Sequence, residues 1–157
     1  MKVPVTALLA ILAAASSAGA RPVRIEVTRD NSIVLYRGEY HLNAGRKTRI
    51  RIKGNQHLVA MAFDMRPLAG KLIESATLVC HRAAHDIDQV AVSTIQADWD
   101  EQKSNALTSG LQGAEGWGVP GARFPTVTGG NSFSLVCHAK SAVRNGAYHW
   151  NIAPDLV

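Results

Sequence analysis

LVCH stands twice in this chain, at residues 78–81 and again at 135–138, and the two copies contain the only cysteines, Cys80 and Cys137. Side chains on a β-strand point alternately to its two faces. Each cysteine therefore shares an apolar face with the leucine two positions before it, while the histidine that follows points to the other face. The two copies predict a pair of core strands.

The same alternation limits what the Cys-His pairs can do. Neighbouring residues on a regular strand point apart, so neither pair ligates one zinc ion easily or forms a local nucleophile pair. Two interpretations of the cysteines stay open. They are buried thiols that pack as small apolar residues, or Cys80 and Cys137 form a disulfide, which needs Cα atoms about 4.4–6.8 Å apart. We favour thiols, because the sequence does not show whether the strands are neighbours.

Outward from these stretches, short runs rich in β-branched and aromatic residues alternate with turn-forming residues. This pattern predicts an all-β fold, either a β-sandwich or a β-barrel. Turns are expected at residues 29–31 and 43–45, and one helical turn near 102–107 within a long irregular region, 101–130. The expected strands are 23–28, 32–36, 47–53, 57–64, 73–82, 89–96, 132–139 and 147–152.

The N-terminus has the three parts of a secretory leader. Lys2 is followed by an apolar run and then by small residues that end at Ala20, so we expect cleavage after Ala20. The apolar run is too short and too rich in alanine to favour a membrane anchor. The expected organisation is a signal peptide over 1–20 and one β-sandwich domain over 21–157. The mature protein is expected to be secreted, periplasmic or at the cell surface, with no membrane span.

The net charge is +5, and the basic residues are densest between residues 46 and 53. Arg49, Arg51 and Lys53 alternate with isoleucines, so we expect them on the solvent-exposed face of a strand. Export argues against a nucleic-acid partner. An acidic polysaccharide is a better candidate partner for this basic region, and Arg49 and Arg51 are candidate ligand contacts.

Few other residues suggest chemistry. Trp117 lies between glycines and is either a ligand platform or a side chain that packs the loop onto the sandwich, whereas Tyr148 lies on the last strand and is a candidate contact. Asp98 and Asp100 could serve a structural calcium ion, although hydrogen bonding at a strand end is favoured. No catalytic motif appears, so we assign no catalytic residue, no metal ligand and no cofactor other than that optional calcium.

Several segments resemble the DNRLRE-type domains, also called disaggregatase-related modules. Residues 57–64 run into Ile-Glu-Ser-Ala-Thr-Leu at 73–78, and Asp98-Trp99-Asp100-Glu101 is similar to the family's Trp-Asp-Glu signature. Residues 150–157 resemble its later Trp-Asp-Val-Thr-x-x-Val segment. The resemblance spans about residues 31–157. It implies a jelly-roll-like antiparallel β-sandwich, similar to carbohydrate-binding modules, found in secreted and often multidomain proteins, with no catalytic residues to carry over.

The resemblance and the residues together predict a secreted, non-catalytic module that binds extracellular or cell-wall polysaccharide. In the family further strands follow the segment at 150–157, so we expect a C-terminally truncated or minimal jelly roll. Such a module would be the N-terminal accessory part of a larger glycan-active or surface protein, with any catalytic domain beyond residue 157. The alternative is a structural surface or stalk domain without a ligand.

Overall fold

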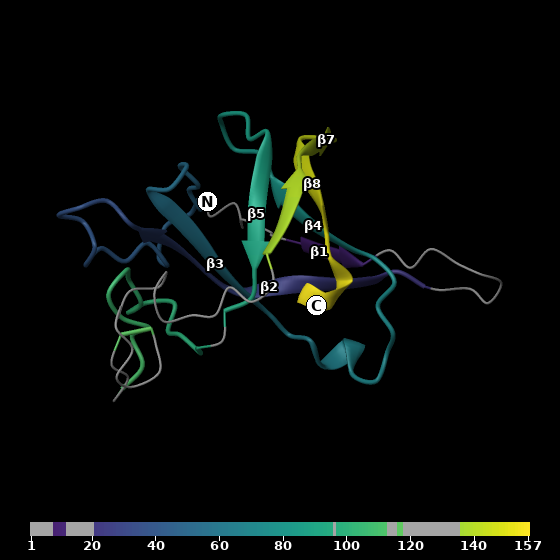
Figure 1. The fold of residues 1–157 in the computed structure, drawn as a ribbon, viewed down its shortest axis with the longest axis horizontal. Coiled ribbons are helices and arrows are strands. Elements are labelled where there is room, and N and C mark those ends of the chain that lie inside the picture. The colour runs from purple at the N-terminus through teal and green to yellow at the C-terminus, as the bar shows by residue number, and fades with distance from the viewer. Residues whose placement is uncertain (1–7, 12–20, 96, 113–115, 118–135) are drawn as a thin grey trace. The chain divides into compact units, whose positions relative to one another are not determined.

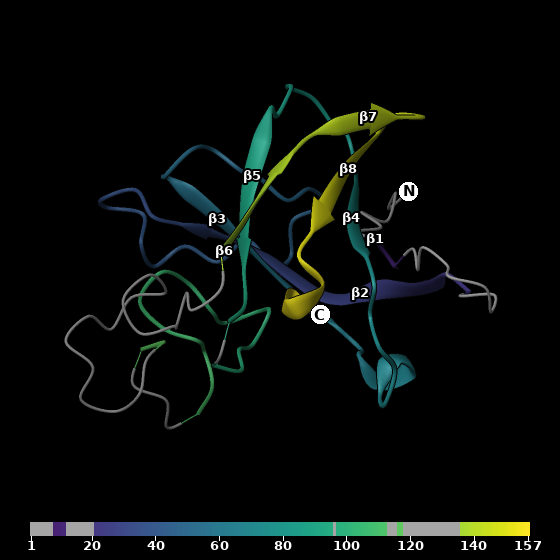
Figure 2. The ribbon, with the colours of Figure 1, turned by 45° about the vertical axis from the view of Figure 1, so that its right-hand side comes forward.

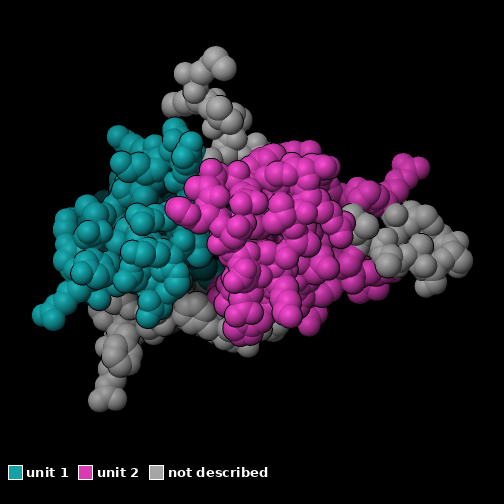
Figure 3. All heavy atoms as spheres, turned by 90° about the horizontal axis from the view of Figure 1, so that it is seen from above, with its two compact units in different colours: residues 1–3, 29–62, 95–133 teal, residues 4–28, 63–94, 134–157 magenta. Residues whose placement is uncertain are grey.

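The computed structural model describes residues 8–11, 21–95, 97–112, 116–117 and 136–157 (Figure 1). The chain divides into two compact units, coloured teal and magenta in Figure 3. Unit 1 contains Arg29–Ala62 and the described part of Ile95–Phe133, and unit 2 contains the described part of Pro4–Thr28 with Phe63–Thr94 and Ser134–Val157. This division describes packing, and the single domain over 21–157 stays a prediction.

The regular elements of the described chain are β-strands and two short 3-10 helices. The strands with a recorded register pair in the antiparallel sense, which confirms the all-β, antiparallel, sandwich-like fold. The jelly-roll order stays a prediction. The elements are β1 (Leu8–Ile11), β2 (Val23–Val34), β3 (His57–Phe63), η1 (Arg66–Leu68), β4 (Ala76–His81), β5 (Gln89–Ser93), β6 (Val136–Lys140), β7 (Ala142–Arg144), β8 (Ala147–Ile152) and η2 (Pro154–Leu156).

Unit 2 contains a sheet with the order β2-β1-β4-β8-β7 and a two-stranded sheet of β5 and β6. Its core includes the buried residues Ile25, Leu68 and Ala76, and partly buried apolar residues pack against them. The β7–β8 hairpin, seen in Figure 2, closes through Asn145 and Gly146, which both have positive φ angles, 49° and 74°. Asn-Gly is the favoured pair for such a tight hairpin turn.

Unit 1 contains the second half of β2 and its neighbour β3, together with the irregular segment 97–112. Five buried residues form its core: Ile33, Ala60, Trp99, Ala106 and Trp117. Three of these five come from outside the strands. These three are Trp99 and Ala106 of the irregular segment and Trp117 beyond it. The irregular segment therefore contributes to the core of unit 1 without strand pairing, and polar contacts must hold its backbone in place.

Asn31 provides the central contact of this kind. It is fully buried, and its Nδ2 donates to the carbonyl oxygen of Ser104 (3.0 Å) and to Ser104 Oγ (2.8 Å). Its Oδ1 accepts from the backbone N–H of Ala44 at 3.1 Å. The predicted turn at 29–31 is therefore wrong. β2 runs straight through these residues, because their polar side chains bind other segments instead of turning their own backbone.

The expected turn at 43–45 lies beside the same clamp. Asn43 Nδ2 donates to the carbonyl oxygens of Glu101 (2.8 Å) and Ser104 (2.7 Å). Gly45 lies so close to this segment that an added Cβ would be 1.9 Å from the Glu101 carbonyl oxygen. Glycine is needed here for close backbone approach and not for its conformational freedom.

The other predicted strands and the predicted helical turn are confirmed only in part. Residues 147–152 form β8 as predicted. One helical turn is closed by the Ser104 N–H, which donates to the Asp100 carbonyl oxygen (2.9 Å), so it spans 100–104 and lies earlier than the turn expected near 102–107. The predicted strand over 47–53 is wrong, since only Lys53 pairs there, in an isolated bridge to His57. Residues 132–135 lie outside the described residues.

Exchange of Asn31 for aspartate tests the clamp. Aspartate has the same shape, but when ionised it only accepts hydrogen bonds, so it would face the Ser104 oxygens without a proton to donate. We expect Asn31→Asp to lower the free energy of unfolding by about 3 kcal/mol or more, measured by urea denaturation. The exposed Asn55→Asp is the matched control, and equal effects of the two changes would contradict the clamp.

Candidate functional site

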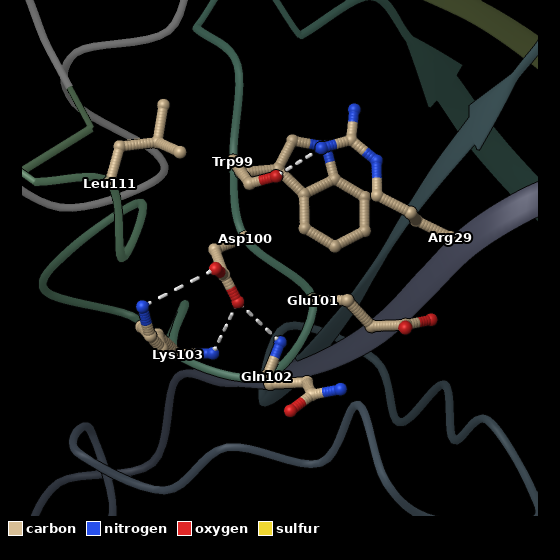
Figure 4. A pocket seen from close by; sticks show the side chains of 7 residues that line it. All are labelled: Arg29, Trp99, Asp100, Glu101, Gln102, Lys103 and Leu111. Atoms are coloured by element: carbon tan, nitrogen blue, oxygen red, sulfur yellow. Dashed lines mark hydrogen bonds and ion pairs between the residues drawn. The ribbon is translucent and has the colours of Figure 1, made fainter.

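The described residues of unit 1 line a hollow that is built around Trp99 (Figure 4). It has a volume of about 450 Å³. The Arg29 guanidinium lies over the Trp99 ring, 5.1 Å from its centroid. The residues that line it are Arg29, Trp99, Asp100, Glu101, Gln102, Lys103 and Leu111.

The polar groups of this first hollow are already engaged. Arg29 donates to the Trp99 carbonyl oxygen and to Asp98 Oδ1 (2.9 Å), and this second bond lowers the pKa of Asp98. The Asp100 carboxylate accepts from the backbone N–H groups of Gln102 (2.8 Å) and Lys103 (3.1 Å), and Figure 4 shows it turned toward them. These contacts fix the Trp99–Lys103 backbone, so this hollow is explained by structure alone.

The second hollow lies where β2 ends and β3 begins, and its volume is about 320 Å³. It falls within the range of small-molecule sites, roughly 300–1,000 Å³. We call it the tyrosine–arginine pocket. The residues that line it are Tyr36, Glu39, Arg51, Lys53, Gln56 and His57.

Two turns build the walls of the tyrosine–arginine pocket. The first is closed by the Glu39 N–H, which donates to the Tyr36 carbonyl oxygen (3.0 Å), and the second by the Gln56 N–H, which donates to the Lys53 carbonyl oxygen (2.9 Å). The Gln56 carbonyl oxygen in turn accepts from the Leu35 N–H at 2.7 Å. Both turns are thus joined to the end of β2, which holds the lining side chains near one another.

The exposed surface of this pocket is aromatic and basic. Tyr36 is 53% exposed. Arg51 is also exposed, and its backbone N–H donates to Ser32 Oγ (2.6 Å). Burial, followed by the charges of Arg51 and Lys53, lowers the pKa of His57, against a smaller opposing effect of Glu39. The His57 Nδ1 atom is buried and has no hydrogen-bond partner among the described residues.

The structure places the predicted contacts in different environments. Trp117 is 1% exposed and packs in the unit 1 core, where its Nε1 donates to the Asn105 carbonyl oxygen at 2.5 Å. Its ring offers no free face for a ligand, which agrees with the packing alternative. Arg51 lines the tyrosine–arginine pocket, whereas Arg49 is exposed but does not line it.

Tyr148 in unit 2 is also buried, at 3% exposure. Its ring stacks on Trp150 with the centroids 5.2 Å apart. Its hydroxyl donates to the His85 carbonyl oxygen (2.7 Å) and accepts from the Ile87 N–H (3.1 Å). This geometry assigns Tyr148 to holding the 82–88 connection and leaves it no surface for a ligand.

The cysteines lie on different sheets of unit 2. Cys80 is opposite Tyr148 on β8, and Cys137 is opposite Val92 on β5. Both are thiols, and Cys80 is buried while Cys137 is half-buried. Within the described residues no group of three or more histidine, cysteine or carboxylate side chains could hold a metal ion.

Sequence reasoning missed most of the tyrosine–arginine pocket. It expected Tyr36 inside a strand and named Arg51 as the candidate ligand contact among the residues that line this pocket. The available signal was a tyrosine followed two positions later by Gly38, whose φ of 92° permits a turn. Comparisons of the chain with protein-family models, with curated proteins and with solved structures find no match. No helix among the described residues is long and apolar enough to cross a membrane.

Removal of one hydroxyl tests the structural role of Tyr148. In Tyr148→Phe the Ile87 N–H and the His85 carbonyl oxygen lose their partner, while the stacked ring stays. We expect the free energy of unfolding to fall by about 1–2 kcal/mol, measured by thermal or urea denaturation. Tyr36→Phe, at an exposed ring, is the control and should change it by less than about 0.5 kcal/mol. A similar loss in both variants would argue against this role.

Proposed function

We propose that this chain is a secreted, non-catalytic module that binds extracellular or cell-wall polysaccharide, and that the tyrosine–arginine pocket is its binding site. The observation that carries the proposal is the exposed Tyr36 ring beside the Arg51 and Lys53 side chains in one open hollow. An aromatic ring offers a flat apolar surface for a sugar ring. Cationic groups beside it favour a sugar that carries a carboxylate or sulfate.

Two further features support a binding role over catalysis. The pocket contains one carboxylate, that of Glu39, whereas glycoside hydrolysis generally uses two across the scissile bond. The charged side chains are exposed at the rim, where they attract and orient an anion at modest affinity. We therefore expect weak, salt-sensitive binding that gains strength along a repeating polymer.

The structural alternative also has an observation in its favour. Trp117 and Tyr148, the two aromatic residues expected to contact a ligand, are both buried and serve packing. A surface or stalk domain needs only such packing. This alternative predicts that the chain binds neither acidic nor neutral polysaccharides.

Matched arginine variants separate the two functions. With oligogalacturonate as an acidic probe, we expect Tyr36→Ala and Arg51→Ala each to weaken binding about tenfold, since a charge-assisted hydrogen bond contributes about 1.5–3 kcal/mol. Arg49→Ala removes the same charge outside the pocket lining and should change affinity less than about twofold. Calorimetry at low salt measures all three, with a neutral cello-oligosaccharide as control. No binding by the unaltered chain to either probe would favour the structural alternative.

The pKa of His57 gives the site a pH dependence. A histidine with a lowered folded pKa binds fewer protons than it does in the unfolded chain, so its protonation costs stability as the pH falls below about 6.5. A bound anion favours the protonated form. The other charged groups of the pocket are Arg51, Lys53 and Glu39.

We therefore expect affinity for oligogalacturonate to rise between pH 7.5 and 5.5 while the melting temperature of the free protein falls. His57→Gln should flatten both trends, because glutamine does not titrate. The exposed His41→Gln is the control and should keep both trends. An unchanged pH profile in the His57→Gln variant would remove His57 from the binding site.

A further inference from the structure

The strand β1 occupies an unusual place in unit 2. It lies between β2 and β4 and pairs antiparallel with both, so it is an internal strand of that sheet. Yet β1 is Leu8–Ile11, which falls inside the segment that the sequence predicts to be a cleaved leader. The sheet is thus completed by residues that export is expected to remove.

The register defines what this position requires. Position 9 lies opposite Ile25 on one side and Leu78 on the other, and Leu78 is in turn opposite Trp150. Ile25 and Leu78 belong to the unit 2 core. Because residues in register share a face of the sheet, an occupant contributes the residue at this position to the core face.

The neighbouring position faces the other way. Position 10 lies opposite Arg24 and Thr77. Arg24 is exposed, and Thr77 Oγ1 donates to Asn151 Oδ1 at the surface (3.1 Å). An occupant therefore needs an apolar side chain at one position and tolerates a polar one at the next, which is the pattern of an extended, half-buried strand.

Loss of β1 would open this position. Val23–Glu26 on β2 and the residues 77–79 on β4 would lose the strand between them, and their inward backbone groups would lose ladder partners. Such unpaired edges are templates for another chain. β2 and β4 run parallel to each other, since each is antiparallel to β1, so they cannot replace the lost antiparallel pairing with one another.

We propose that the slot between β2 and β4 is a strand-acceptor site, filled after export by an extended apolar segment of a partner protein. This proposal rests on the leader prediction and is independent of the polysaccharide site. The partner is a different polypeptide and not a second copy, because the described strands of the mature chain are all paired within their own sheets. Addition of a strand gives affinity through backbone hydrogen bonds and specificity through alternate side chains.

The leader segment itself supplies the probe. The full-length chain is exported from a bacterial host, and its N-terminus is determined by mass spectrometry. We expect it to start at Arg21, to be monomeric, and to bind a synthetic peptide of residues 5–14, VTALLAILAA. Binding should raise the melting temperature and slow amide exchange at 23–26 and 77–79.

Two peptide variants test the register. A Leu9→Asp peptide places a carboxylate at the core position and should bind at least tenfold more weakly, whereas an Ala10→Asp peptide should bind about as well as the original. Equal binding of the two variants would overturn the proposal. So would a purified chain that still begins at Met1, which would keep its own strand in the slot.

Two outcomes of the amide-exchange measurement would also contradict the proposal. If the processed chain is monomeric, protects the amides of 23–26 and 77–79 without peptide and binds none, the sheet closes by itself and the slot does not exist. If it protects them only as a dimer, the occupant is a second copy and the partner is wrong. Failure to bind glycans would affect none of these measurements.

Discussion

The fold of unit 1 depends on one buried amide. Asn31 joins three stretches of backbone, its own strand, the turn that contains Ala44 and the segment that contains Ser104. A buried amide is tolerated only when its donors and acceptor are paired, and those of Asn31 meet Ser104 and Ala44. Through Ser104, the hydrogen bonds of Asn31 hold the segment that carries Trp99 and Ala106 into the core. The apolar packing of unit 1 therefore depends on this polar pairing.

The division of the aromatic residues follows from that constraint. A loop that must fill a core uses its largest side chains there, which is why Trp99 and Trp117 are buried. Tyr36 lies beyond the end of β2 and is exposed. Tyr36 is thus a ring that does not belong to the core of unit 1, and it lies beside the exposed basic residues Arg51 and Lys53.

Sequence patterns predicted β8, the turn at 43–45 and the sandwich-like class, because alternation and turn residues act locally. They failed at 29–31 because Arg, Asp and Asn are typical both of a turn and of a strand whose polar side chains bind distant segments. The prediction of a strand at 47–53 was wrong because alternation shows which side chains are exposed to solvent, but not whether the backbone pairs with another strand. β7 was missed although Asn145-Gly146 marks the hairpin.

The contacts of β2 differ along its length. Its second half pairs with β3 and is also held by side chains, since the partners of Asn31 and Ser32 are Ser104, Ala44 and Arg51. Its first half, Val23–Glu26, is held on one side by backbone pairing with β1. Backbone pairing specifies direction and spacing but little sequence, so one apolar strand can replace another there. An exchange of the strand beside Val23–Glu26 therefore leaves the Asn31 clamp with all its partners, which makes a replaceable strand compatible with a stable unit 1.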